Sequence, residues 1–201
     1  MELLVLFILL AFGAYLAKSR EQGRRIALLG SYLGKYQIEK LMENLTDGYL
    51  RALSEPEPER QGQIWHMLDA AEETLCEQFN RFVDEFSSVG GAQTRVSRLP
   101  FALPWVDQLL PASSFDLRQA LRIHAQGIER AAQNSRQRTQ KDKAFTLSAE
   151  LFLMQHTCHW FCRSKMVASA RMLMRHKTPY AQLLASVAPE TRQAYGALVG
   201  A

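Results

Sequence analysis

The sequence is poor in cysteine, proline and glycine, and these shortages exclude several classes of protein. Its 201 residues include only 3 cysteines, an odd and sparse set that argues against a secreted disulfide scaffold and fits a reducing compartment. With 7 prolines and 11 glycines, the chain is neither collagen-like nor a long disordered tail. It also lacks a glycine-rich phosphate loop, an internal repeat and a convincing run of alternating strand residues. These absences favour a folded, all-α protein.

Catalytic motifs are missing as well. Serine, histidine and aspartate are present, but no nucleophile elbow, zincin helix motif or kinase motif set accompanies them. No nucleophile can be paired with a base along the chain, and a helical bundle pattern is shared by too many unrelated proteins to indicate an activity. We therefore expect a protein that is not an enzyme.

One long apolar run stands out in a chain of otherwise mixed polarity. The mean hydropathy is −0.18, which excludes a polytopic membrane protein, but Leu3 to Ala17 is a stretch of fifteen uncharged and almost wholly apolar residues. As a helix this run covers about 22 Å, against about 30 Å for the hydrocarbon core of a bilayer. Lys18 and Arg20 can extend the span by snorkelling while the bilayer thins locally. The run therefore predicts a single transmembrane helix.

The order of the charges indicates how that helix is oriented. A cleaved secretory signal has positive charge before its apolar core, whereas here the basic cluster follows the run. Its members are Lys18, Arg20, Arg24 and Arg25. By the positive-inside rule, we predict a retained signal anchor over residues 1–20 in an inner membrane, with the N-terminus outside and residues 21–201 in the cytoplasm. The cluster is also a candidate contact for anionic lipid, and an ordinary buried core helix is the alternative interpretation of the run.

Apolar residues recur at helical spacing through most of the remaining chain. The pattern predicts long helices over 24–53, 58–88, 113–134 and 139–176, followed by two short ones. Ser113 with Asp116, and likewise Thr139 with Asp142, has the spacing of a capping box. We expect an antiparallel bundle of about four long helices with short C-terminal helices, forming one cytoplasmic domain.

Charge is unevenly divided along the chain, although the net charge is only +4. Residues 1–35, 36–90 and 91–201 carry net charges of +3, −8 and +9. The simplest interpretation is that acidic and basic helices dock against one another. Alternatively, a solvated basic connection over 133–143 attracts anionic lipid through Arg136, Arg138, Lys141 and Lys143. Nucleic acid is a less favoured partner, because no recognised nucleic-acid module accompanies the charge.

Residues 97–112 contain three prolines among large apolar side chains and cannot form one long helix. Either they plug the end of the bundle, or they form an exposed patch for a protein partner or a membrane surface. The candidate partner-binding side chains are Phe101, Leu103, Trp105 and Leu109.

A dense group of possible metal ligands lies within the last long helix: His156, Cys158, His159 and Cys162. The two cysteines are one turn apart with His159 beside them, so they could bind zinc with a further ligand from another helix, and the histidines could bind haem. Against this, the same face carries an apolar stripe from Leu147 to Met166, in which a small buried cysteine needs no function. We therefore expect no cofactor, with zinc or haem as the alternative.

These patterns lead to one functional hypothesis and one alternative. The hypothesis is a non-enzymatic, membrane-anchored cytoplasmic helical module that binds another protein, as a scaffold or assembly factor of a membrane complex. The alternative is a metal- or haem-binding bundle that uses Cys158, His159 and Cys162.

Overall fold

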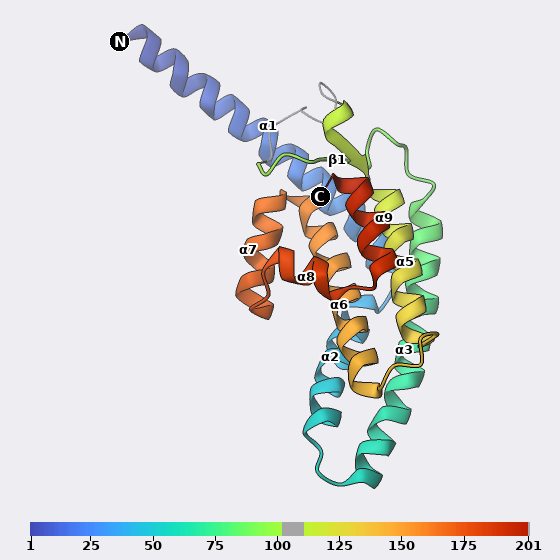
Figure 1. The fold of residues 1–201 in the computed structure, drawn as a ribbon. Helices are drawn as coiled ribbons and strands as arrows, with labels where there is room; N and C mark the ends of the chain where they lie inside the picture. The colour runs from blue at the N-terminus through green and yellow to red at the C-terminus, as the bar shows by residue number, and fades with distance from the viewer. Residues whose placement is uncertain (102–110, 201) are drawn as a thin grey trace.

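The computed structural model describes residues 1–101 and 111–200, and this part of the chain is almost entirely helical (Figure 1). Its helices are α1 (Glu2–Leu33), α2 (Ile38–Ser54), α3 (Pro58–Phe86), α5 (Leu117–Ala132), α6 (Gln140–Cys162), α7 (Lys165–His176), α8 (Tyr180–Ser186) and α9 (Pro189–Val199). A 3-10 helix, η1 (Pro111–Ser113), precedes β2 (Ser114–Asp116), which pairs antiparallel with β1 (Arg95–Ser97). The all-α class is confirmed. This two-stranded β-ribbon of β1 and β2 was not predicted from the sequence, because strands of 3 residues are too short to show an alternating pattern.

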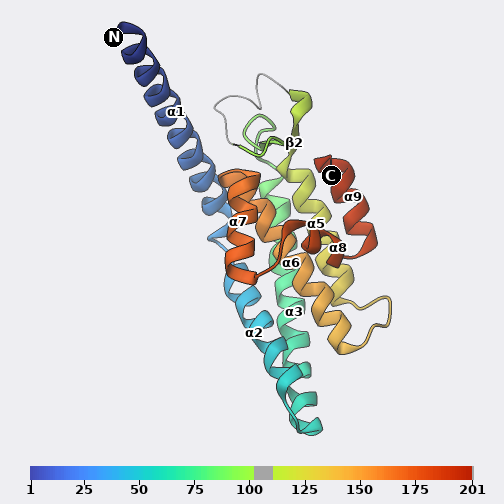
Figure 2. The same ribbon diagram turned by 60° about the vertical axis from the view of Figure 1, so that its left-hand side comes forward.

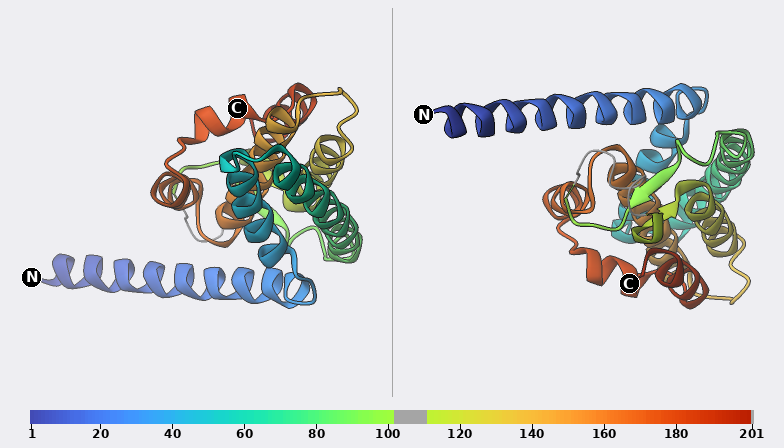
Figure 3. Two further views of the ribbon diagram at one scale, coloured as in Figure 1. Left: turned by 90° about the horizontal axis from the view of Figure 1, so that it is seen from below. Right: turned by 90° about the horizontal axis from the view of Figure 1, so that it is seen from above.

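The N-terminal half of α1 projects from the body of the molecule (Figures 1 and 3). Its large apolar side chains from Leu3 to Leu16 are between 44% and 72% exposed, and 0% of its 18-residue apolar window is buried. The alternative of an ordinary core helix is therefore wrong, because a core helix buries its apolar face. By length and composition, α1 is able to cross a membrane.

α1 runs without a break from this apolar segment into the body, where Leu29 is buried. The sequence predicted one continuous helix over 24–53, but a turn separates α1 from α2. A Cβ atom at Gly34 would lie 2.9 Å from the carbonyl oxygen of Gly30, so glycine permits the close end of α1. The backbone N–H of Gln37 then donates to the side-chain oxygen of Gln78 at 2.7 Å, which ties the turn to α3.

α6 lies at the centre of the body, in contact with α5, α7, α8 and the C-terminal half of α1 (Figures 1 and 2). Because other elements cover it on several sides, α6 buries side chains around most of its circumference, among them Leu151 and Trp160. α2 and α3 form a hairpin beside it. Three phenylalanines of α3, each at most 1% exposed, form much of the core there: Phe79, Phe82 and Phe86.

The predicted helix over 139–176 is interrupted after Cys162. Thr139 caps α6 as predicted, because its side chain accepts a hydrogen bond from a backbone N–H three residues on. A second cap, Ser164, then starts α7 in the same way. Met166 consequently leaves the predicted apolar stripe, since it lies on α7 and is 52% exposed.

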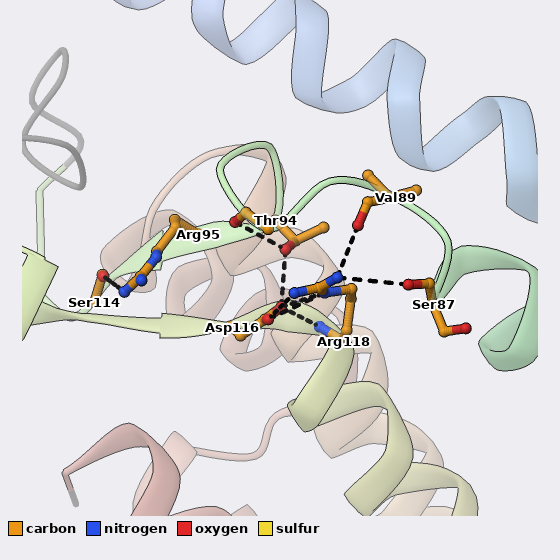
Figure 4. A network of polar contacts seen from close by, with 8 residues as sticks. Ser87, Val89, Thr94, Arg95, Ser114, Asp116 and Arg118 are labelled. Carbon is orange, nitrogen blue, oxygen red and sulfur yellow. Dashed lines mark hydrogen bonds and ion pairs between the residues drawn. The ribbon is translucent and has the colours of Figure 1, made fainter.

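Asp116, rather than Ser113, caps α5, and it also joins three segments (Figure 4). Its carboxylate accepts hydrogen bonds from the Thr94 hydroxyl at 2.8 Å and from the backbone N–H of Arg118 at 2.9 Å. The Arg118 guanidinium lies 2.7 Å from that carboxylate and donates to the carbonyl oxygen of Val89 at 2.9 Å. Burial alone would raise the pKa of Asp116, but the hydrogen bonds from Arg118 and Thr94 outweigh it and hold the pKa below its usual value. This network fixes the β-ribbon of β1 and β2 to the end of α3 and the start of α5.

A buried ion pair joins α3 to α6. The ammonium nitrogen of Lys143 lies 2.6 Å from Glu72 Oε2 and 2.9 Å from Asp69 Oδ1, and the Tyr49 hydroxyl of α2 donates to Glu72 Oε1 at 2.6 Å. Lys143 is only 8% exposed. The expectation that Lys143 belongs to a solvated, anion-binding connection is therefore wrong, because its charge is used inside the protein between the acidic and the basic parts of the chain.

Candidate interaction groove

An open groove lies between α2 and α7, with α6 and the end of α1 as its floor; we name it the α2/α7 groove. It consists of two adjoining hollows, of about 950 Å³ and about 280 Å³. Both hollows are lined by Gly30 of α1, Met42 of α2 and His159 of α6. Because these residues are shared, the two hollows form one continuous surface.

The floor of the α2/α7 groove is mixed, with apolar side chains around the polar groups of Gln155 and His159. Its apolar side chains come from α1, α2 and α6: Leu29, Leu33, Met42, Phe152, Met154, Cys158 and Cys162. Leu29, Met42 and Met154 are buried, and the others are partly exposed. A floor of this kind supplies binding energy that is independent of charge, as the apolar centre of a protein interface does.

The two walls of the groove carry opposite charge. α2 contributes three carboxylates that the helix places on one face, those of Glu39, Glu43 and Asp47, and one ammonium group, that of Lys40. This wall is therefore predominantly acidic. The opposite wall contributes the guanidinium groups of Arg163, Arg171 and Arg175. Within residues 1–101 and 111–200, no ion pair joins one wall to the other. Like charges four residues apart slightly destabilise a helix, although Glu39 lies in the first turn of α2, where a carboxylate is favourable.

Two histidines add polar groups to the groove. Nδ1 of His159 lies 3.2 Å from Nη1 of Arg171, and this nitrogen must accept because the guanidinium can only donate. The ring of His176 stacks on Phe152 with 3.9 Å between the centroids. Burial lowers the pKa of both histidines, and neighbouring arginines lower it further, which favours the neutral form of both rings.

The structure does not bring the four predicted metal ligands together. Cys158, His159 and Cys162 all line the α2/α7 groove. His156 is buried instead against α7, where its Nε2 lies 3.0 Å from the hydroxyl of Ser169. Among the described residues, no group of three or more His, Cys, Asp or Glu side chains is placed to hold a metal ion. Zinc or haem binding stays a prediction, which metal analysis and an absorption spectrum of the purified protein would test.

Both thiols of the groove are weak nucleophiles. Burial raises the pKa of Cys162 to about 11, although Arg163 and Arg25 oppose the shift, and burial raises the pKa of Cys158 further still. The reactive thiolate is therefore scarce at neutral pH. Such weak nucleophilicity is what buried cysteines ordinarily show.

The basic cluster after the apolar run is divided between the surface and the body. Three members lie on the surface of α1: Lys18, Arg20 and Arg24. The guanidinium of Arg25 instead lies 5.4 Å from the centroid of the Phe161 ring. Beside it, the Gln22 side-chain oxygen accepts a hydrogen bond from Arg163 at 2.8 Å. These contacts fix the position at which α1 leaves the body.

The other predicted contact residues are placed only in part. Phe101 is 57% exposed, whereas Leu103, Trp105 and Leu109 lie outside the described residues. Lys141 is exposed. Arg136 and Arg138 line a small second pocket beside α9.

Sequence reasoning missed both walls of the α2/α7 groove. The available signal was the spacing, because Glu39, Glu43 and Asp47 recur every four residues and Arg171 and Arg175 are also four apart. Such spacing predicts that side chains share one face of a helix. It does not predict that two charged faces lie on either side of the same hollow.

No protein-family model, curated protein or solved structure matches the chain. The functional argument therefore depends on the groove, on its charges and on the apolar segment of α1.

Proposed function

We propose that this protein is a non-enzymatic, membrane-anchored helical module that binds another protein through the α2/α7 groove. The observation that carries the proposal is the composition of the groove, a partly apolar floor between a predominantly acidic and a basic wall that do not pair with each other. Such a surface offers both binding energy and a means of discriminating between partners.

Membrane attachment is supported by the exposed apolar half of α1. Leaving a large apolar side chain in water rather than burying it costs about 1.5–3 kcal/mol, and α1 exposes a continuous series of such side chains. A bilayer would remove this cost. The basic residues that follow the run fit the cytoplasmic face of an inner membrane, so the body and the groove would lie in the cytoplasm.

An amphipathic helix is the partner that best fits the groove. Its apolar face would cover the floor, acidic side chains along one edge would face Arg171 and Arg175, and basic side chains along the other edge would face Glu39 and Glu43. Binding in the reverse direction would exchange the two edges and place like charges together. The walls therefore favour one orientation of the partner.

The position of the groove indicates where this partner comes from. Ile26 lines one end of the groove, and it follows Ala17 by about 14 Å along the helix. A helix that emerges from the same membrane beside α1 would reach the groove directly. We therefore propose that the partner is a membrane protein with an amphipathic cytoplasmic helix close to its own transmembrane segment.

Site-specific photocrosslinking in the native membrane tests this proposal. A photoreactive residue in place of Thr46, which lines the groove, is expected to give a reproducible protein adduct. The same residue in place of Gln63, which is exposed on α3, is expected to give none. Absence of an adduct at Thr46, with a monodisperse monomer after detergent extraction, would contradict the proposal.

A matched pair of charge reversals tests the role of the acidic wall. Glu43→Lys with Asp47→Lys is expected to lower the yield of the Thr46 adduct about tenfold, which corresponds to about 1.4 kcal/mol of binding free energy. The control, Glu73→Lys with Glu77→Lys, makes the same change at the same spacing on an exposed part of α3 and should leave the yield unchanged. Equal yields from the two double variants would show that the wall is not used.

A further inference from the structure

A second pocket is formed where the connection between α5 and α6 meets the start of α9. Its volume is about 50 Å³, and its lining includes Arg130 from α5, Arg136 and Arg138 from the connection, and Ala188 and Glu190 from the start of α9. A cavity of about 10–15 Å³ is enough to hold one water molecule. The pocket therefore has room for one small polyatomic ion rather than for a whole metabolite.

Two of the three guanidinium groups have no hydrogen-bonded or ion-paired partner, although both attract the Glu150 carboxyl electrostatically and lower its pKa. Arg136 pairs with Glu190. Within the described residues, the side chains of Arg130 and Arg138 form no hydrogen bond and no ion pair. Nε of Arg130 is buried without an acceptor. Since buried N–H groups in folded proteins nearly always have an acceptor, whether a protein group, a water molecule or a ligand, this donor is available to a bound anion.

The neighbouring carboxyl groups do not neutralise the pocket. Glu190 is engaged by Arg136. Glu150 lies behind the start of α9, where its Oε1 accepts a hydrogen bond from the backbone N–H of Ala188 at 2.9 Å. Burial raises the pKa of Glu150 to about 7, so it carries only part of a negative charge at neutral pH. Three positive charges thus face one full and one partial negative charge.

The connection is held in a defined shape before any ligand binds. Asn134 adopts a positive φ of 47°, which asparagine tolerates better than most residues. Its side chain donates to the carbonyl oxygen of Arg138 and accepts from the backbone N–H of Arg138, both at 2.9 Å. These two bonds close the loop on which Arg136 lies. Preorganisation of this kind reduces the entropy lost when a ligand binds.

We propose that Arg130, Arg136 and Arg138 bind the phosphate group of a soluble ligand, such as inorganic phosphate or a phosphate monoester. The forked N–H groups of arginine match phosphate oxygens in pairs. The first turn of α9 adds the positive end of a helix dipole, which Glu190 and the Glu150 carboxyl already meet in part. In Figures 1 and 2 the connection lies on the opposite side of the body from the N-terminus, which places it away from any bilayer that α1 spans. The site does not depend on the α2/α7 groove.

Inorganic phosphate is the probe in a calorimetric titration of the full chain in detergent, at constant ionic strength. Saturable binding of one phosphate per chain is expected. Arg130→Gln and Arg138→Gln should each weaken the affinity for phosphate at least about tenfold, because each variant loses one guanidinium group that donates paired hydrogen bonds to the phosphate oxygens. Arg122→Gln, on the exposed face of α5, is the matched control and should bind like the wild type. Equal binding by all three variants, or heat that chloride reproduces at the same ionic strength, would overturn the proposal.

A protection experiment requires no variant and so does not depend on variants that fold. Phenylglyoxal modifies accessible arginines, and mass spectrometry measures the rate at each position. Phosphate is expected to slow modification of Arg138 but not of Arg122, whereas equal rates with and without phosphate would overturn the proposal. Vesicles of phosphatidic acid are added in a parallel sample. If vesicles protect Arg138 and soluble phosphate does not, the ligand is a lipid headgroup and the assignment to a soluble ligand is wrong.

Discussion

Among single residues, Lys143 has a side chain that is costly to remove, because its charge is buried against that of Glu72. We expect Lys143→Met to lower the free energy of unfolding by about 3–5 kcal/mol, since it leaves a buried carboxylate without its cation. Denaturant unfolding followed by circular dichroism measures the change. Lys141→Met, in the same turn but exposed, is the control and should change stability by less than about 0.5 kcal/mol.

The double variant Lys143→Met, Glu72→Gln distinguishes lost charge from lost packing. Because no buried charge remains, the double variant should recover much of the stability that Lys143→Met loses. The amide oxygen of glutamine can still accept the hydrogen bond from Tyr49, which Glu72 accepts at 2.6 Å in the native protein. A double variant less stable than Lys143→Met would show that the ion pair is not the main contribution of Lys143.

The raised pKa of Glu150 leads to a specific prediction of how the stability of the protein depends on pH. Its folded-state pKa of about 7 lies above the ordinary value of 4.5, mainly because of burial. Between these two pH values the native protein keeps a proton that the unfolded chain has released. The carboxyl therefore lowers the free energy of unfolding as the pH rises from about 4.5 to about 7, by about 3 kcal/mol in total.

Glu150→Gln removes this titration and retains an oxygen that can accept from Ala188. The variant should gain stability relative to the wild type between pH 5 and pH 8, as measured by urea unfolding at each pH. Burial also lowers the pKa of His124 and His156 to about 3, and their contribution to stability is lost as the pH falls from about 6.5 towards 3. The wild type and the Glu150→Gln variant share these histidines. The difference between their free energies of unfolding therefore reports on Glu150 alone. Parallel stability curves would contradict the prediction.

Among the secondary-structure elements, α1 consists of two parts with different roles. Deletion of residues 2–17 removes no buried side chain, so the body should keep its midpoint of thermal unfolding within a few degrees while the protein moves from the membrane to the soluble fraction. Leu29→Ala changes the buried part of the same helix and should cost about 2–5 kcal/mol. Scanning calorimetry and membrane fractionation measure the two effects. A truncated body that unfolds, or a full-length protein that is soluble, would refute this division.

The helices were easier to predict than their ends. The apolar spacing in α3 and the cap at Thr139 are local signals, and both were interpreted correctly. The end of α1 at Gly34 and the start of α7 at Ser164 were missed, because a glycine or a serine inside an apolar pattern is compatible with either a continuous or a broken helix. Tertiary contacts decide between the two, as when Gln78 of α3 accepts the N–H of Gln37.

For the whole molecule, the sequence indicated that acidic and basic segments dock but not which charges meet. Lys143 was expected in solvent, yet it reaches Glu72 on a different helix. The α2/α7 groove was invisible for the same reason, because its walls come from residues more than a hundred positions apart in the chain. Helical periodicity specifies the faces of separate helices, whereas a site between helices depends on how they are arranged.

The continuity of α1 from its apolar segment to the buried Leu29 has a mechanical consequence. A domain on a flexible linker can rotate freely about its attachment point, but this helix of 32 residues has no joint. If its outer part crosses a bilayer, its inclination fixes the direction in which the groove opens. Thicker or thinner bilayers change the inclination of a membrane helix. The local thickness of the bilayer would then determine which neighbouring membrane proteins the groove faces.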